Sequence, residues 1–403
     1  MEKTVKIMTV EIMHLLQILW KRHTRGLVLW WLRWFCPVRR GRTMFVSWNG
    51  AHYNCNPRAI AEALARDEDT ARHFELNYAF LHPEDFPEVP SQVHKVVLGS
   101  LEYYRLLASA QFIVSNVRFA GANFPYKKRQ QRYIQTMHGG HGIKRVEFDV
   151  ELPEDYMRCA VEDTRRTDLM LSDSRYWTQI YRSAFRYRGE VLEQGLPRNH
   201  VFFADAASRQ QIRRRVLDYT HLSDDVRMLL YTPTFRGNGR RDVYGFDVDR
   251  VVAALESRFG GVWHVLVSSH PNMRDYYREI YDFSHPHLVD VGAYPELQDL
   301  LAAGDALITD YSSAEMDFSL TRRPIFQLIR DLTDYDRGCY IHPRQLPFPF
   351  AATDDELIRN IETFDPAQYE AALDRFNREE IGLNETGHAA EAVVRWMKDK
   401  INE

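Results

Sequence analysis

The chain has 403 residues, 45% of them hydrophobic and 27% charged, and a formal net charge of -4. This composition is typical of a soluble globular protein of two or three domains, and the acidic balance argues against a general nucleic-acid-binding protein. The four cysteines lie far apart and form no CxxC pair, which predicts free thiols in a reducing compartment, without a disulfide framework or a zinc site.

Residues 1–42 differ from this average because they contain nine basic residues and only two acidic ones. Their second apolar run, GLVLWWLRWF, is broken by Arg33 and is too short for the ~20 apolar residues that a bilayer span needs. No small-residue cleavage site follows it, so we do not expect a signal peptide. Basic residues beside Trp30, Trp31 and Trp34 indicate a segment that lies on a membrane surface. The alternative is a helix packed against the body of the protein.

After Arg42, apolar runs alternate with segments of helical periodicity. In the first half we expect strands at 43–50, 74–81, 93–100, 111–116 and 132–140, and helices at 56–67, 101–110 and 174–185. In the second half we expect strands at 225–237, 262–271, 287–292, 305–310 and 323–329, and helices at 246–260, 294–304, 311–321, 354–364 and 386–400.

This alternation predicts an α/β fold of two Rossmann-like domains that face each other across a cleft, each with a largely parallel sheet. We place the first domain at 43–195 and the second at 196–385, followed by a C-terminal helix at 386–403. The turn-forming residues Gly-Leu-Pro-Arg-Asn, at 195–199, link the two halves.

Polar clusters follow several predicted strands, at the edge where ligands bind in open parallel sheets. Asp310, Ser312 and Ser313 stand where a strand turns into a helix, a position that suits a phosphate or simply a helix cap. Thr234 and Arg236 follow another strand and suit a pyrophosphate, or form an ordinary turn with an exposed arginine. A third cluster contains His270 before Pro271, where the histidine contacts a phosphate or caps the strand.

The segment IQTMHGGHGIKR, residues 134–145, places His138 and His141 in a glycine-rich loop. A metal site would need more ligands, and Lys144 and Arg145 would repel a divalent cation. The glycines do not have GxGxxG spacing, so a dinucleotide fingerprint is absent from this loop. Acid–base chemistry remains, with His138 as the candidate base because it directly follows the strand, and with nearby positive charge keeping it neutral.

Taken together, SWNGAHYNCNPRAIAEAL, QTMHGGHGIKR, EQGLPRNHVF, YTPTFR, SSHP and ITDYSSAEMDFSLTRRPIFQLIRDLTDYDRGCY resemble the CDP-glycerol glycerophosphotransferase family of teichoic-acid primases and polymerases. The resemblance runs from about Met44 to Tyr340. It implies a GT-B architecture of two Rossmann-like domains. It also implies an enzyme on the cytoplasmic face of the bacterial cell membrane that moves glycerol phosphate from CDP-glycerol to a hydroxyl of a lipid-linked glycan or growing polymer, releasing CMP.

The resemblance also implies roles for individual residues. His138 and His270 would be catalytic, the first as base and the second by stabilising the transferred phosphate. The donor diphosphate would be held by Thr234, Arg236, Asp310, Ser312 and Ser313. On the acceptor side, in the domain at 43–195, we place Gly50, Asn116, Gly139, Gly140 and Lys144. We interpret His141 as a loop residue that faces the acceptor or solvent. We expect no tightly bound cofactor or protein metal; Mg²⁺ that accompanies the nucleotide is compatible with the sequence but not required by it.

Two departures from the family pattern bear on specificity. Met137 stands where the polymerases usually have tryptophan, and the loop HGGHGIK is longer than their HGTPLK and closer to the primase type. Ser268 and Ser269 replace a basic and an aliphatic residue before His270. Three alternatives therefore stay open: a transferase for CDP-ribitol or another CDP-polyol, in capsule rather than teichoic acid synthesis; a GT-B glycosyltransferase that uses a nucleotide sugar; and a membrane-surface scaffold without catalysis.

Overall fold

The structure, a computed structural model, describes residues 27, 30–32, 34–66, 70, 72–119, 127–234, 236, 242–268 and 279–403. The chain forms two compact units. Unit 1 consists of Met1–Met137, Pro153–Met170 and Glu391–Glu403, and unit 2 consists of His138–Leu152 and Leu171–Ala390.

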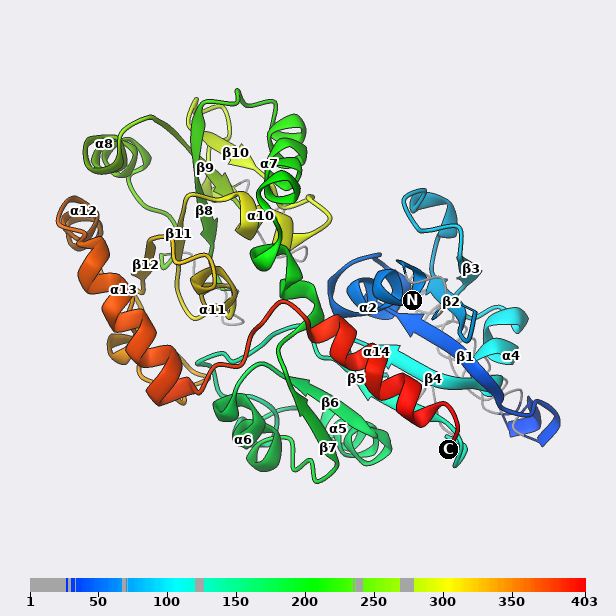
Figure 1. The fold of residues 1–403 in the computed structure, drawn as a ribbon. Coiled ribbons are helices and arrows are strands. Elements are labelled where there is room, and N and C mark those ends of the chain that lie inside the picture. The colour runs from blue at the N-terminus through cyan, green and yellow to red at the C-terminus, as the bar shows by residue number, and fades with distance from the viewer. Residues whose placement is uncertain are drawn as a thin grey trace, which may run out of the picture. The chain divides into compact units, whose positions relative to one another are not determined.

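The first sheet has the strand order β3-β2-β1-β4-β5-β6-β7, and the pairings from β1 to β6 are parallel. Its strands are β1 (Arg39–Val46), β2 (Glu75–Phe80), β3 (Val93–Val97), β4 (Ala110–Ser115), β5 (Arg132–Gln135), β6 (Leu169–Ser172) and β7 (Glu190–Glu193). Among the described residues, the labelled α-helices of unit 1 are α2 (Cys55–Arg66), α4 (Leu101–Ser109), α5 (Glu154–Arg166) and most of α14 (Ala389–Lys400). Within unit 1, α14 lies along β4, where Trp396 contacts Phe112 (Figure 1).

The second sheet lies entirely in unit 2, has the order β10-β9-β8-β11-β12-β13 and is parallel throughout. Its strands are β8 (Val226–Thr232), β9 (Val262–Val267), β10 (Leu288–Asp290), β11 (Ala306–Thr309), β12 (Ile325–Leu328) and β13 (Phe350–Ala351). The helices of unit 2 are α6 (Arg175–Ser183), α7 (Ala206–Thr220), α8 (Val248–Phe259), α10 (Leu297–Ala303), α11 (Ala314–Ser319), α12 (Asp354–Glu362) and α13 (Pro366–Arg375). Figure 1 shows α8 and α12 on one side of this sheet and α7 and α10 on the other.

Each unit has its own apolar core. In unit 1, Met44 and Val46 of β1 pack with Ile113 of β4 and Leu107 of α4. In unit 2, the core collects the buried residues of β8, β9, β11 and β12 and the inner faces of the helices around them. Strands that are buried on both faces are expected in a parallel sheet covered by helices, and β4, β6, β11 and β12 are buried along their whole length.

Side-chain caps explain where many helices begin. Ser100, Ser174, Asp205, Asp247 and Thr353 each accept a hydrogen bond from a backbone N–H in the first turn of the helix that follows. Such caps satisfy donors that would otherwise have no partner at a helix start.

The predicted α/β class with two parallel sheets is confirmed. Several elements differ from prediction or went unpredicted. β1 begins at Arg39, inside the membrane-surface segment predicted at 1–42. α11 begins at Ala314 rather than at 311. The segments 138–152 and 171–195, predicted as parts of the first domain, lie in unit 2, and residues 391–403 of the predicted C-terminal helix lie in unit 1.

Candidate active site

The loop that carries His138 lies in unit 2, against the turn that leads into α11. A Cβ atom built on Gly139 would be 3.3 Å from Oγ of Ser313, and one built on Gly142 would be 3.4 Å from Cβ of Ser313. The glycines therefore let the loop backbone approach Ser313 closely. His138 itself is exposed and therefore accessible to a ligand.

His141 is buried, which corrects the interpretation that it faces the acceptor or solvent. Its side chain is 3% exposed, and its Nδ1 lies 2.8 Å from Oδ2 of Asp173. The backbone N–H of His141 donates to the same carboxylate, at 3.0 Å from Oδ2. Burial alone would lower the pKa of His141, but the carboxylate of Asp173 outweighs it and raises the pKa above its usual value. The spacing of the histidines could not reveal this carboxylate, which lies 32 residues away in the chain.

A second buried ion pair supports the start of the loop. Arg198 donates from Nη1 to the carbonyl oxygen of His138 and from Nη2 to Asp317 of α11, the latter at 2.5 Å. Asn199 and Gln298 also donate to Asp317, at 3.2 and 2.9 Å. Arg198 and Asn199 come from the Gly-Leu-Pro-Arg-Asn segment, which therefore does more than link two halves of the chain. We did not predict that Arg198 and Asn199 belong to the site. The only hint in the sequence was their position in a turn-forming segment.

The predicted donor-side residues Thr234, Arg236 and Asp310 are brought together at the ends of β8 and β11. The carboxylate of Asp310 accepts from the backbone N–H of Thr234 at 2.9 Å and pairs with Arg236 at 2.9 Å. Arg236 also pairs through Nε with Asp331, at 2.7 Å. The guanidinium is 4% exposed, so it is largely engaged by these two carboxylates. Asp331 is a member of this cluster that sequence analysis did not select.

Aromatic rings close one side of the same cluster. Tyr311 and Tyr335 stack with their ring centroids 3.7 Å apart, and the guanidinium carbon of Arg236 lies 4.9 and 5.3 Å from the two rings. Cation–π contacts of this kind hold an arginine in one orientation. The stacked tyrosines thus fix the arrangement of Arg236 and its carboxylates.

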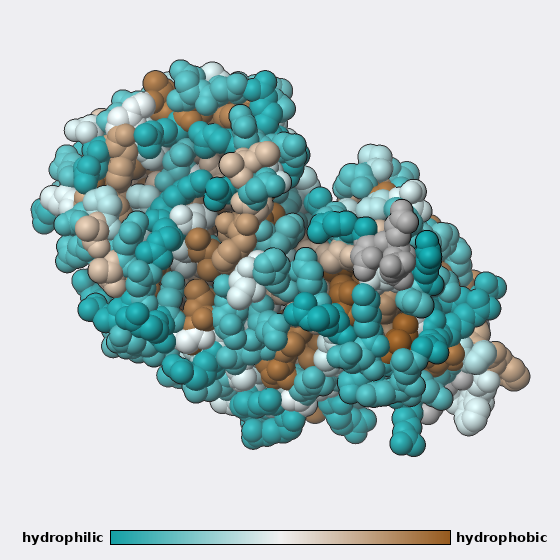
Figure 2. Space-filling view, in the orientation of Figure 1, coloured by the Kyte–Doolittle hydropathy of each residue, from teal (hydrophilic) through white to brown (hydrophobic). Residues whose placement is uncertain are grey.

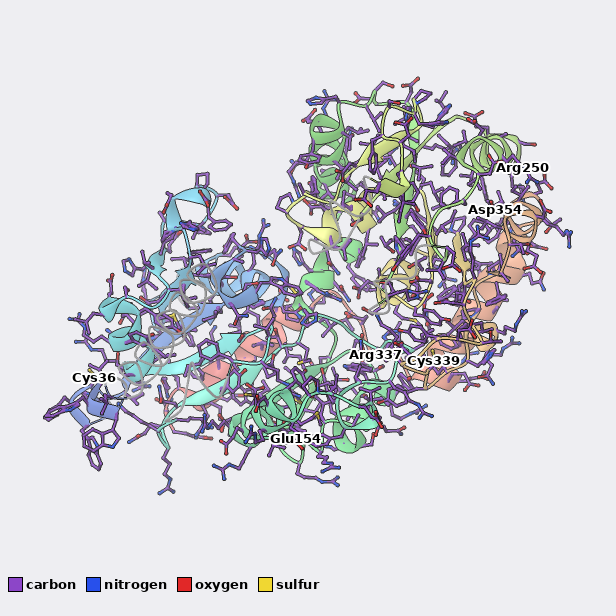
Figure 3. The ribbon with its side chains drawn as sticks, turned by 180° about the vertical axis from the view of Figure 1, so that it is seen from behind. Cys36, Glu154, Arg250, Arg337, Cys339 and Asp354 are labelled. Atoms are coloured by element: carbon purple, nitrogen blue, oxygen red, sulfur yellow. The ribbon has the colours of Figure 1, made fainter. Side chains whose placement is uncertain are left out.

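Lys144 lies beside this cluster rather than apart from it. The pKa of Lys144 is lowered to about 8, mainly by burial; the carboxyl groups of Asp310 and Glu315 oppose this shift, and the guanidiniums of Arg337 and Arg236 add to it. The backbone of Lys144 pairs in an antiparallel bridge with Cys339. Figure 3 labels Cys339 and Arg337, which lie next to each other on this segment.

Ser312 and Ser313 lie at the start of α11, both half-buried. Oγ of Ser312 accepts from the backbone N–H of Ala314 at 3.3 Å, while the side chain of Ser313 makes no cap hydrogen bond. Ser313 faces the glycine loop, so the two strand-end motifs that the sequence singled out meet within unit 2.

The remaining predicted residues are located as follows. Asn116 and Gly50 lie in unit 1, where Asn116 accepts from the N–H of Trp48 at 2.9 Å and donates to Ser47 at 3.2 Å. Gly50 has φ 84° and packs on the backbone of Leu81, which explains the glycine. His270 lies outside the described residues. Within the described ranges, no three His, Cys, Asp or Glu side chains cluster as a metal site would require.

The part of the chain that the structure describes includes no helix with the length and apolar character to span a bilayer. It includes the aromatic residues that follow Leu27. Trp30, Trp31, Trp34 and Phe35 are between 45% and 69% exposed, and Trp31 stacks on Phe35 with ring centroids 5.2 Å apart. In Figures 1 and 2 this short segment protrudes beyond the start of β1.

Comparison with known proteins finds teichoic acid polymerases and primases among the relatives of this chain. The teichoic acid poly(glycerol phosphate) polymerase of Bacillus subtilis (strain 168) is 28% identical over 83% of this chain, which covers 45% of that protein. The teichoic acid ribitol-phosphate primase of Bacillus spizizenii is 32% identical over 43% of the chain and 44% of that protein. The chain therefore spans about half the length of the B. subtilis polymerase.

A solved structure of the wall teichoic acid polymerase TagF, a histidine-to-asparagine variant soaked with CDPG, superposes with a TM-score of 0.80 at 27% identity, covering 97% of both chains. The sequence profile of the CDP-glycerol:poly(glycerophosphate) glycerophosphotransferases matches residues 29–398, which is most of the chain. The chain thus belongs to the CDP-glycerol:poly(glycerophosphate) glycerophosphotransferase family.

Proposed function

We propose that this protein transfers glycerol phosphate from CDP-glycerol to a hydroxyl group of a lipid-linked glycan or polyol-phosphate acceptor, with release of CMP, in the synthesis of a teichoic acid or a capsule-type polymer. The observation that carries the proposal is the close approach of Gly139 to Ser313. This approach brings the loop of the exposed His138 to the turn before α11, which is the predicted phosphate site. Both belong to unit 2, so this pairing exists within one compact body.

The proposed reaction is an in-line displacement at the β-phosphorus of the donor. The acceptor oxygen attacks that phosphorus while its proton passes to a ring nitrogen of His138. The bond from the β-phosphorus to the bridging oxygen breaks, and CMP leaves with the bonding electrons. Transfer of this type depends mainly on positioning and on electrostatic stabilisation, so a few fixed donors suffice.

The proposed hydrogen-bond donors to the diphosphate are Ser312, Ser313, Thr234 and Lys144. We assign Lys144 to the donor side because its neighbours Asp310 and Arg236 form the strand-end cluster. Arg236 holds Asp310 and Asp331 and is largely engaged by them, which supports a role in shaping the phosphate site as much as in contacting phosphate. His270 stays a prediction for stabilising the transferred phosphate.

We infer that the enzyme works on the cytoplasmic face of the cell membrane as a peripheral protein. The support is the set of exposed aromatic side chains at Trp30, Trp31, Trp34 and Phe35, next to basic residues in the sequence. Amphipathic aromatic residues favour the membrane–water interface, and a surface site would keep the enzyme near a lipid-linked acceptor.

A transferase for CDP-ribitol is the second candidate, and it is favoured by the similarity to a ribitol-phosphate primase. The purified protein should be incubated with a short lipid-linked acceptor and, in parallel, with CDP-glycerol, CDP-ribitol and UDP-sugars. Release of CMP from CDP-glycerol, with an acceptor product heavier by one glycerol phosphate in mass spectrometry, is the expected result. Release of CMP from CDP-ribitol alone would show that CDP-ribitol, not CDP-glycerol, is the donor substrate. Release of UDP alone would overturn the proposed reaction class.

A further inference from the structure

The loop of His138 is held by a buried histidine–carboxylate pair that neither the family resemblance nor the proposed mechanism requires. Asp173 follows β6 and stands directly before α6. It accepts from the N–H of His141 at 3.0 Å and from Nδ1 of His141 at 2.8 Å. Ser174 donates to the other oxygen of Asp173 at 2.9 Å. One carboxylate therefore fixes both the backbone and the side chain of His141.

The fit around this carboxylate is tight. A Cβ atom on Gly140 would lie 1.8 Å from Oδ2 of Asp173, so only glycine can precede His141 in this arrangement. The hydroxyl of Tyr176, on α6, donates to the carbonyl of Gly142 at 3.3 Å. Asp173 and α6 thus hold the loop from Gly140 to Gly142, while Arg198 holds the carbonyl of His138.

We propose that His141 and Asp173 are positioning residues, which act as an ion pair that fixes the loop so that the ring of His138 meets the acceptor hydroxyl. The inference rests on the proposed function, since it concerns the placement of the proposed base. The two residues act together, because His141, the second histidine of the longer loop, pairs with the carboxylate of Asp173.

The charge state of the pair follows from its surroundings. Burial lowers the pKa of His141, but Asp173 and then Asp317 raise it further than burial lowers it. Burial acts to raise the pKa of Asp173, but His141 holds it below its usual range. Arg198 neutralises Asp317 at 2.5 Å, and burial raises the pKa of the neighbouring Glu385 to about 8. The fold therefore favours a protonated His141 beside an ionised Asp173.

The direction of the pH effect follows. A histidine with a raised pKa contributes its ion pair fully below its unfolded value of about 6.5, and the contribution is lost as pH rises through the raised value. The loop should loosen over that range, and kcat should fall because the proposed base is no longer held in line. Loss of the ion pair should by itself change the binding of CDP-glycerol little, since the pair lies on the base loop and not in the strand-end cluster.

Two substitutions separate the charge of His141 from its hydrogen bond. His141→Asn keeps a donor close to the position of Nδ1 but has no titrating ring, whereas His141→Ala removes both. We expect His141→Ala to lower kcat by on the order of 10²-fold, with KM for CDP-glycerol within about 2-fold of wild type. We expect His141→Asn to keep more of kcat and to lose the fall of kcat at rising pH. His221→Asn, at an exposed position after α7, is the matched control and should keep the wild-type profile.

The test is kcat and KM from pH 5.5 to 9, together with an NMR titration of histidine-labelled, substrate-free protein. The raised pKa of Glu385, about 8, also lies within this pH range. The comparison of wild type with His141→Asn therefore decides whether His141 or Glu385 causes the fall of kcat at rising pH. A wild-type kcat in His141→Ala, or an unchanged pH profile in His141→Asn, would overturn the inference. A pKa below 6.5 for the His141 ring in the NMR titration of the wild type would also overturn the inference. This measurement remains possible if the variants are too unstable to assay. Absence of CMP release by wild-type protein contradicts the proposed function instead.

Discussion

Gly139 lies against Ser313, so closely that a Cβ atom on the glycine would be 3.3 Å from the serine Oγ. This approach joins two motifs that are 174 positions apart in the sequence, the loop of His138 and the turn before α11. A base and a phosphate site must lie within a few ångströms of each other for in-line transfer, so the Gly139–Ser313 contact is the structural basis of the proposed function.

The three loop glycines should tolerate alanine to different degrees. Gly140→Ala would place Cβ 1.8 Å from Asp173 and should destabilise the protein or abolish activity. Gly139→Ala, at 3.3 Å from Ser313, should lower kcat by about 10-fold, and Gly142→Ala, at 3.4 Å, should be milder. Thermal unfolding and CMP release measured on the three variants check this order. Ser313→Ala added to Gly139→Ala should relieve the contact, and equal effects of all three substitutions would contradict the packing described.

Lys144 should make donor binding depend on pH. Its pKa is lowered to about 8 by burial, so its positive charge is lost as pH rises through that value. We expect KM for CDP-glycerol to rise above pH 8 in the wild type. Lys144→Gln should raise KM by about 10- to 100-fold at pH 7, because a hydrogen bond to a charged group contributes about 1.5–3 kcal/mol. Lys144→Arg, which stays charged, should remove the rise. A KM for CDP-glycerol that does not change between pH 7 and 9 would speak against a phosphate role for Lys144.

Glu315, fully buried in α11, should be a neutral carboxylic acid. Burial raises its pKa well above the usual range, and one carboxyl oxygen accepts from Nε2 of Gln327 at 3.2 Å. The other oxygen of Glu315 and Oε1 of Gln327 have no hydrogen-bond partner among the described residues, and a proton on Glu315 would serve both.

A raised carboxyl pKa favours folding at low pH, and this contribution is lost as pH rises through the folded-state value. Glu315→Gln should therefore match the wild type in urea unfolding at pH 4, below the usual carboxyl pKa of about 4.3, and be more stable than the wild type at pH 9. Glu356→Gln, at an exposed carboxylate of α12, is the control and should leave the pH dependence of the wild type unchanged. An equal loss of stability for Glu315→Gln at both pH values would show that Glu315 is charged in the fold.

The exposed aromatic segment should bind lipid surfaces. Replacing Trp30, Trp31, Trp34 and Phe35 by serine removes exposed apolar area while leaving β1, which begins at Arg39, intact. A deletion through Arg42 would cut into that strand, so the substituted protein is the cleaner variant. We expect co-sedimentation with anionic liposomes to fall several-fold, while CMP release with a water-soluble acceptor stays unchanged. Liposome binding equal to that of the wild type would exclude these side chains as the membrane contact.

The sequence predicted most of the sheet strands because their apolar runs are buried on both faces, as in β4 and β11. It did not reveal α5 or α7 because few of their residues are buried. In α5 only Ala160 and Asp163 are buried, so no apolar stripe marks that helix. The short strands β6 and β7 offered too few residues for a pattern.

At the candidate site, motif position selected His138, Thr234, Arg236, Asp310, Ser312 and Ser313, and unit 2 contains them all. The partners of these residues were not predicted. Asp173, Arg198 and Asp317 act through tertiary contacts between segments distant in the chain, and no local spacing encodes such contacts. The same limit explains His141, whose loop position suggested solvent although the fold buries it beside Asp173.

The most direct test of the central claim is CMP release from CDP-glycerol by His138→Asn, compared with wild type and with His221→Asn, in the presence of a lipid-linked acceptor. Calorimetry with CDP-glycerol on the same three proteins reports donor binding. We predict that His138→Asn binds CDP-glycerol as wild type does and loses CMP release by about 10²–10⁴-fold, the usual contribution of a general base, while His221→Asn stays active. Full turnover by His138→Asn would contradict the assignment of His138 as the base.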